Sequence, residues 1–197
     1  MTPEQAALLE ELDAHVTSHS RRTLLEHLKG THDLLAQWGN PPWLCTAGLF
    51  HSIYGTYIFD KKSADLSMRA RIREVIGARA EELVFVFCVC DRRCFYDHLG
   101  ESRISVRDDV HARDLALDRE SLAALIEIEV ANVVEQVPYR SRKKALQAAE
   151  LYAPAFRRSR DYISPMAAEA AERCFAAVQA DSQGLNEMRC RSELARE

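Results

Sequence analysis

The sequence predicts an all-α fold, a compact helical bundle around one central buried helix. Apolar residues recur at helical spacing through most of the 197 residues. Residues 43–55 are apolar around the whole circumference of a helix, which is the pattern of a helix buried in the middle of a domain. The β-branched and aromatic run of residues 83–90 has no second long strand candidate to pair with, so it is predicted to be helical as well.

Two helices are predicted before the central one. Thr2 and Gln5 form a capping-box pattern with Pro3 in the first turn, which predicts a helix to about residue 16. The sequence Gly-Asn-Pro-Pro of residues 39–42 ends the second helix, and Gly55 ends the buried third one. The second helix is expected over residues 21–38, where one face carries Leu24, Leu28, Thr31, Leu35 and Trp38.

Helices are also predicted for most of the chain after the central helix. Residues 60–67 should form a loop before a helix that Ser67 caps and Gly77 ends. Residues 103–106 and 114–117 are expected to form a small hairpin. Asp118 should cap a helix through Gln136, and further helices should cover residues 141–152 and 165–180. We therefore expect a single domain over residues 1–183 and a polar, frayed tail over residues 184–197.

Composition and charge narrow the expected partners. The 26 Lys and Arg residues against 30 Asp and Glu give a net charge of −4, which provides no electrostatic reason for binding nucleic acid or an anionic membrane. The longest apolar runs fall short of the roughly 20 residues that span a bilayer. The acidic N-terminus lacks the features of a secretory signal, so a cytoplasmic protein with reduced thiols and a small-molecule substrate is expected. The sequence leaves a homodimer open.

The histidines are the first candidates for a functional site. His27, His32 and His51 lie on or beside predicted buried faces, where each is either a hydrogen-bonded core residue or a ligand. His27 and His32 are about 140° apart on one helix, so they do not easily face the same small site. His27 is favoured, with Thr31 one turn later on its face. The other four histidines lie in polar contexts: His15, His19, His98 and His111.

The arrangement of His27, His51 and Asp91 resembles the HD superfamily. His27 lies 24 residues before His51, across a helix, a break and a buried helix, and Asp91 follows another apolar segment. The segments HLKGT, LFHSIYGT and IGARAE are also similar to an uncharacterised HD-like family. The resemblance covers residues 24–91 and implies an HD-domain-like bundle with His27, His51 and Asp91 as metal ligands. The chain departs from the superfamily at Ser52, where the name-giving aspartate should stand.

The serine changes the chemistry that the resemblance implies. Replacing the aspartate removes a negative charge and a bridging carboxylate, so a two-metal site is hard to sustain. Two imidazoles and one carboxylate suit a single Fe(II), Mn(II) or Zn(II). The leading hypothesis is a metal-dependent hydrolase acting on a small phosphorylated or polar metabolite. A mononuclear non-haem iron oxygenase on the same fold is one alternative, and a metal-free scaffold with a binding or regulatory role is another.

Several other residues are assigned to this hypothetical site. Asp91, Ser52 and Arg92 are the candidate catalytic residues, because a metal would activate water that Asp91 could order. Arg92 and Arg93, beside Asp91, could hold a phosphate. The candidate substrate contacts are Thr31, Tyr54, Thr56 and Arg93.

Two further groups have an ordinary structural explanation. Cys88, Cys90 and Cys94 lack the paired spacing of zinc knuckles and are expected to be buried thiols. Polar residues among the valines of the helix after Asp118 could reach into a pocket, although an exposed stripe is the more common arrangement. These polar residues are Asn132, Glu135 and Gln136.

Overall fold

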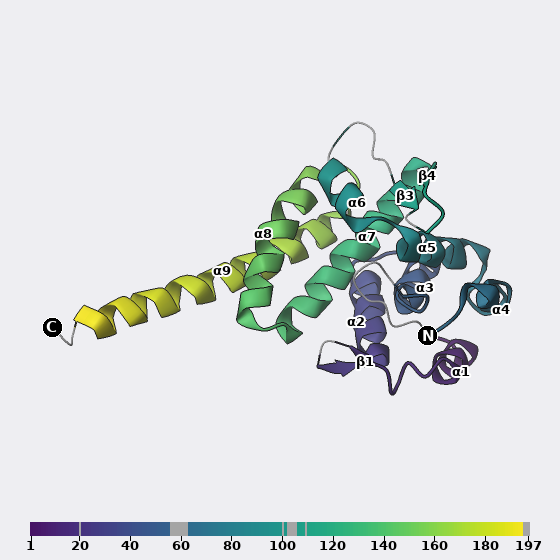
Figure 1. Cartoon of the computed structure of the whole chain (residues 1–197), viewed down its shortest axis with the longest axis horizontal. Helices are drawn as coiled ribbons and strands as arrows, with labels where there is room; N and C mark the ends of the chain where they lie inside the picture. Colours follow the sequence, from purple (N-terminus) through teal and green to yellow (C-terminus); the bar gives the residue numbers. More distant parts are fainter. Residues whose placement is uncertain (20, 56–62, 100, 102–105, 109, 195–197) are drawn as a thin grey trace.

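Helices dominate the computed structural model of the chain, which confirms the predicted fold class (Figure 1). The structure describes residues 1–19, 21–55, 63–99, 101, 106–108 and 110–194, with residues 181–194 described by their backbone alone. One continuous apolar core draws side chains from the first helix to the last. The only sheets among the described residues are two small two-stranded ones.

The first helix begins as predicted and ends early. In α1 (Pro3–Glu11) the Thr2 hydroxyl accepts a hydrogen bond from the backbone N–H of Gln5, which completes the predicted capping box. The prediction of a helix to about residue 16 is wrong. Asp13 has φ 54°, a left-handed conformation that cannot continue an α-helix.

A short hairpin separates the first two helices, where the sequence analysis expected none. It consists of β1 (Ser18–His19) and β2 (Arg22–Thr23), paired antiparallel. The second helix, α2 (Leu24–Gln37), begins later than predicted because Thr23 and Glu26 form a second capping box. The hairpin therefore lies directly before the N-terminus of α2.

The central helix α3 (Pro42–Phe50) follows the predicted break, in which Gly39 has φ 78°. It packs against α2 through Gly48, where a Cβ atom would lie 2.3 Å from Leu35 Cδ1. The helix ends at Phe50 rather than near Gly55, because residues 51–54 form a turn that Gly55 leaves at φ 79°. The early end places His51 at the C-terminal cap of the helix.

Two helices and a short 3-10 turn follow the central helix. Asp65 rather than Ser67 caps η1 (Leu66–Met68), because its carboxylate accepts the backbone N–H of Ser67. The helix α4 (Arg69–Ile76) ends at Gly77, as predicted, with φ 86°. The run of residues 83–89 lies in α5 (Ala78–Val89), so the prediction of a helix is confirmed there.

A small α/β segment connects α5 to the second half of the chain. It contains α6 (Arg92–His98) and a hairpin of β3 (Val106–Asp108) and β4 (Arg113–Leu115), with Val106 opposite Leu115. The expected hairpin is confirmed from Val106 onward, and residues 103–105 lie outside the described residues.

The remaining helices are longer than or equal to their predicted lengths. Asp118 caps α7 (Arg119–Gln136) as predicted and accepts the backbone N–H of Ser121, and η2 (Val137–Tyr139) follows. The helix α8 (Arg142–Arg158) continues past residue 152.

The first part of the last helix, α9 (Pro165–Leu194), packs against α7 and α8, and its C-terminal part extends away from the other helices (Figure 1). It includes residues 184–194 of the segment predicted as a polar tail, and the fraying of that segment stays a prediction. Among the described residues, no helix is both long enough and apolar enough to cross a membrane.

Candidate functional site

Three histidine rings lie in contact, one of them on strand β1, and we call them the histidine cluster (His19, His27 and His51). His27 projects from α2 and His51 from the end of α3, and both are fully buried. Their Nε2 atoms are 3.1 Å apart. The His19 ring stacks on the His27 ring with centroids 4.3 Å apart. The sequence analysis placed His19 in a polar context, but its side chain is buried.

Hydrogen bonds determine which ring nitrogens carry protons. His51 Nδ1 lies 2.7 Å from the carbonyl oxygen of Gly48, which can only accept, so this nitrogen is protonated. His27 Nδ1 lies 2.5 Å from Oε2 of Glu135, in the last turn of α7, and donates to that carboxylate. When both rings are neutral, each Nε2 atom therefore carries a lone pair, and the two Nε2 atoms are only 3.1 Å apart.

The surroundings favour neutral rings. Burial lowers the pKa of both His27 and His51 well below the ordinary value, and neighbouring imidazoles and arginines lower it further. The hydrogen bond of His27 to the Asn132 side chain only partly opposes this lowering of the pKa. Burial, followed by the charge of Arg22, lowers the pKa of His19 to about 4. A proton is therefore a poor occupant of the space between the two Nε2 atoms at neutral pH.

Glu135 links the histidine cluster to Arg22. Its carboxylate accepts from His27 through Oε2 and pairs with the Arg22 guanidinium through Oε1. Burial raises the pKa of Glu135, and the hydrogen bond and charge of Arg22 oppose that rise. Gly30 makes room for this side chain, because a Cβ atom there would lie 2.5 Å from Glu135 Oε1.

Polar side chains continue along the same side of α7. Asn132 donates to Glu129 over 3.4 Å and accepts from Gln136 over 2.5 Å, and Arg140 donates to Gln136 over 2.9 Å. Glu129, Glu135 and Gln136 are all buried. The exposed stripe expected for this helix is therefore wrong for Glu135 and Gln136, and Glu135 contacts the histidine cluster through His27.

Asp91, the predicted third metal ligand, has a different role. Its carboxylate caps α6 and accepts the backbone N–H groups of Arg93 and Cys94 over 2.9 and 3.2 Å. Within the described part of the chain, no group of three or more His, Cys, Asp and Glu side chains is arranged to hold a metal ion. The structure thus brings His27 and His51 together but does not add Asp91 to them.

The other predicted contacts near the histidines differ in their environment. Thr31 is buried on α2, and its hydroxyl donates to the backbone oxygen of His27, so it is already used within its own helix. Ser52 is buried in the turn after α3, where its backbone oxygen accepts from Gly55. Thr56 lies outside the described residues.

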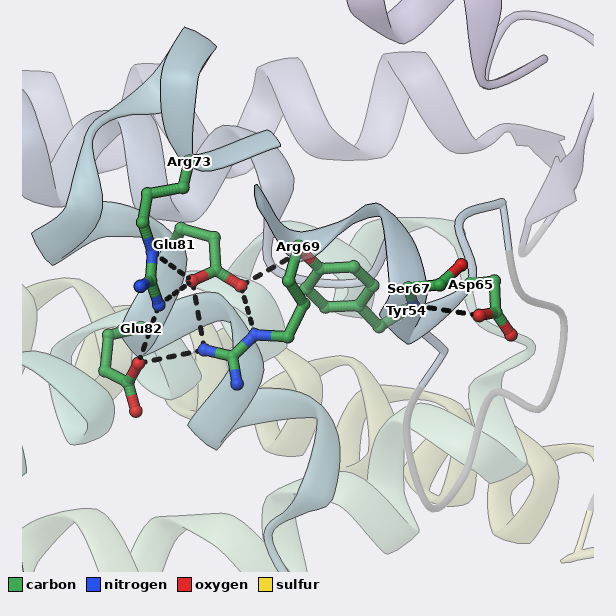
Figure 2. Close-up of polar contacts among 7 residues, drawn as sticks. All are labelled: Tyr54, Asp65, Ser67, Arg69, Arg73, Glu81 and Glu82. Atoms are coloured by element: carbon green, nitrogen blue, oxygen red, sulfur yellow. Dashed lines mark hydrogen bonds and ion pairs between the residues drawn. The ribbon is translucent and has the colours of Figure 1, made fainter. Parts of the chain in front are cut away.

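Tyr54, a predicted substrate contact, takes part in a separate ion cluster (Figure 2). Its hydroxyl donates to the fully buried Glu81 carboxylate over 3.1 Å. Arg69 and Arg73 each place two nitrogens within hydrogen-bonding distance of the same carboxylate, and both also pair with Glu82. This ion cluster therefore joins the turn after α3 to α4 and α5.

The Glu81 carboxylate should make stability depend on acid pH. Burial raises its pKa, but the hydrogen bonds from Arg69 and Arg73 outweigh burial and hold it below the ordinary value of 4.5. A lowered folded-state pKa adds stability above the unfolded-state pKa, and this stability is lost as pH falls through the folded-state value. We expect Glu81→Gln to cost about 2 kcal/mol at neutral pH and progressively less in acid.

Urea unfolding of wild type and Glu81→Gln across this pH range measures that difference. The matched control is Glu74→Gln, which neutralises an exposed glutamate in the neighbouring α4. A stability gap between wild type and Glu81→Gln that stays constant with pH would contradict the role assigned to Glu81.

Arg92 and Arg93 are separated by the structure. Arg92 is buried with its Nη1 atom 3.6 Å from Oε2 of Glu129, and its guanidinium lies 3.8 Å from the centre of the Phe87 ring. Phe87 in turn makes an edge contact with the His51 ring, so Phe87 lies between Arg92 and the histidine cluster. Arg93 is exposed. The assignment of both arginines to one phosphate site is therefore not supported by their positions.

The site that emerges is a buried pair of imidazoles held in place by a carboxylate and a carbonyl. Metal-bound histidines commonly donate their second ring nitrogen in this way, which fixes the ring orientation. Two imidazole nitrogens on one metal at about 2.0–2.1 Å lie roughly 2.9–3.4 Å apart for octahedral to tetrahedral angles. The observed 3.1 Å between the Nε2 atoms fits that range. His27 and His51 could therefore hold a transition metal ion through their Nε2 atoms.

Fold and site together define a mostly α-helical protein with a buried histidine–carboxylate centre. Residues 8–92 match the domain of unknown function DUF6817. This match includes all of the histidine cluster and ends before α7, which supplies Glu135. No curated protein and no solved structure matches the chain.

Proposed function

We propose that this chain is an HD-like, metal-dependent hydrolase that acts on a small phosphorylated or polar metabolite. His27 and His51 would hold one divalent ion, Fe(II), Mn(II) or Zn(II). The observation that carries the proposal is the 3.1 Å approach of two Nε2 atoms whose Nδ1 atoms are both used as donors. A bound ion would lie to one side of the line joining the two Nε2 atoms, accept a lone pair from each, and so relieve the repulsion between two close, buried nitrogens.

Each neighbouring residue has a defined task in this proposal. Gly48 fixes the protonated nitrogen of His51, and Glu135 does the same for His27 while Arg22 balances its charge. A bound divalent ion would supply an activated water molecule. With only two protein nitrogens on the ion, the remaining positions would be for water and substrate.

A metal-free binding protein is the second candidate. Asp91 is committed to capping α6, and the described residues contain no three-ligand metal group. These two observations favour a chain that keeps the helical fold without the metal chemistry. The metal content of the purified protein distinguishes the two candidates.

The test is elemental analysis of the full chain, purified without chelators or a metal-binding tag and then loaded anaerobically with Fe(II), Mn(II) or Zn(II). We expect about one ion per chain for wild type, and its loss in His27→Ala and His51→Ala, because each variant removes one of two nitrogens. His32→Ala is the matched control, since His32 lies on the same helix and pairs with Asp33 near the surface.

Folding of each variant is checked by circular dichroism, so that metal loss is not confused with unfolding. Metal-dependent release of inorganic phosphate from a panel of nucleotides and sugar phosphates then tests the hydrolase assignment. If the Fe(II)-loaded protein consumes oxygen and releases no phosphate, the function would be that of an oxygenase rather than a hydrolase. A folded wild type that retains none of the three metals would favour the metal-free candidate.

A further inference from the structure

A second polar feature lies beside the histidine cluster, where the β1–β2 hairpin meets the C-terminal end of α7. Arg22 of β2 reaches from the hairpin to Glu135. Its guanidinium carbon lies 3.7 Å from the centre of the Tyr139 ring, and Tyr139 is 42% exposed. Arg22 therefore connects the buried histidines with the surface of the protein.

Arg22 has more hydrogen-bonding capacity than the described residues use. A guanidinium carries five N–H donors in a planar fork. The Arg22 side chain is only 10% exposed, and its Nη2 atom pairs with Glu135. Its Nε atom is buried and has no hydrogen-bond partner in the part of the chain that the structure describes. A buried donor without an acceptor is costly, and an oxygen of a bound ligand would satisfy it.

The charges around this donor also favour an anion. Arg140 directly follows Tyr139, and it donates to the neutral Gln136 amide rather than to any carboxylate among the described residues. Of the two guanidinium groups, only that of Arg22 pairs with the Glu135 carboxylate. His19, on the strand that pairs with the Arg22 strand, stacks on His27 with ring centroids 4.3 Å apart. Two guanidinium groups thus lie next to the histidine cluster, and the Glu26 carboxylate that feels the charge of Arg22 is exposed to solvent.

From these contacts we infer that Arg22 and Arg140, together with His19, bind an anionic group of the ligand that occupies the histidine cluster. Phosphate and carboxylate share the required chemistry, because both present oxygens to the planar N–H fork of arginine. The inference rests on the proposed function in one respect, namely that the ligand reaches the histidine cluster. It identifies the class of substrate as a small molecule that carries a phosphate or a carboxylate.

The probes are inorganic phosphate and acetate, each titrated calorimetrically into the full chain. Every titration is made on metal-loaded and on chelator-stripped protein, so that binding to the metal is separated from binding to the arginines. We expect saturable binding to wild type, weakened at least about tenfold in Arg22→Gln and in Arg140→Gln. Tighter binding of phosphate assigns the group to phosphorylated ligands, and tighter binding of acetate assigns it to carboxylates.

Two further variants keep the test independent of folding and of general charge. Arg22→Lys retains the charge that pairs with Glu135 but lacks the planar fork, so it should fold and still bind the probe weakly. Arg21→Gln removes the same charge from an exposed position in the same hairpin and should bind like wild type.

Equal weakening in Arg21→Gln, or no binding of either probe to wild type, would overturn the inference. Metal content measured on the same samples separates this failure from that of the proposed function. If the protein binds metal but its anion binding does not depend on Arg22 and Arg140, the proposed function stands and the anion site is wrong. If anion binding depends on the arginines but the protein binds no metal, the anion site stands and the proposed metal-dependent function is wrong.

Discussion

Replacing Arg92 by methionine is expected to lower the free energy of unfolding by about 3–5 kcal/mol, because it leaves the buried Glu129 carboxylate without its cation. Both side chains are almost completely buried, and Arg92 also donates to the backbone oxygen of Phe87 over 2.9 Å. Burial alone lowers the pKa of Arg92, but Glu129 and other neighbours outweigh burial and hold the pKa above its ordinary value. Urea unfolding followed by circular dichroism measures the loss.

The expected loss belongs to the pair and not to the arginine alone. The double variant Arg92→Met, Glu129→Leu should recover much of the stability, since no buried charge then lacks a partner. Arg93→Met is the matched control on the same helix and should change stability by less than about 0.5 kcal/mol. If Arg92→Met were as stable as this control, Arg92 would not be the structural residue described here, and its predicted catalytic role would regain support.

Glu135→Gln is expected to weaken metal binding by about 10–100-fold while the protein stays folded. Glutamine keeps the length of the side chain and an acceptor for His27 Nδ1, but it removes the negative charge that makes the imidazole a better ligand. Loss of the Glu135 carboxylate also leaves Arg22 without its ion partner. Competition against a chromophoric chelator measures the affinity for Zn(II).

Glu120→Gln provides the control for this charge change, because Glu120 lies on the same helix and is exposed. It should bind metal like wild type. Wild-type affinity in Glu135→Gln would mean that the carboxylate does not position His27 for a metal.

The sequence predicted the helices well where one local signal was sufficient. The Thr2 and Asp118 caps, the break at residues 39–42 and the helical form of residues 83–89 are all present. Errors arose where two local signals competed. Thr23 and Glu26 form a capping box that begins α2 later than the apolar spacing suggested.

The candidate site was only partly predictable, because its members come from distant parts of the chain. The spacing of His27 and His51 identified the pair that the structure brings together. Glu135 lies 108 residues after His27, and no local pattern distinguishes a buried glutamate on α7 from an exposed one. Gly30 makes room for that carboxylate, but a glycine within a helix does not by itself indicate which side chain fills the space.

Two residues were misassigned in opposite directions: His19 was left out of the site and lies in it, whereas Asp91 was assigned to the site and lies elsewhere. His19 is preceded and followed by polar residues, and only the hairpin fold brings its ring against His27. Asp91 follows an apolar segment as a ligand might, but it also stands where α6 needs an N-cap, and it serves as that cap. A carboxylate at the start of a helix has this competing explanation in any sequence.

The central claim is that His27 and His51 hold one metal ion through their Nε2 atoms. Pulsed electron paramagnetic resonance of the Cu(II)-loaded protein tests it most directly, because the remote Nδ1 nitrogens of coordinated imidazoles give countable couplings. The account predicts two coordinated imidazoles in wild type and one in either His27→Gln or His51→Gln, with His32→Gln unchanged. A spectrum without imidazole couplings, or one that both variants leave unchanged, would contradict it.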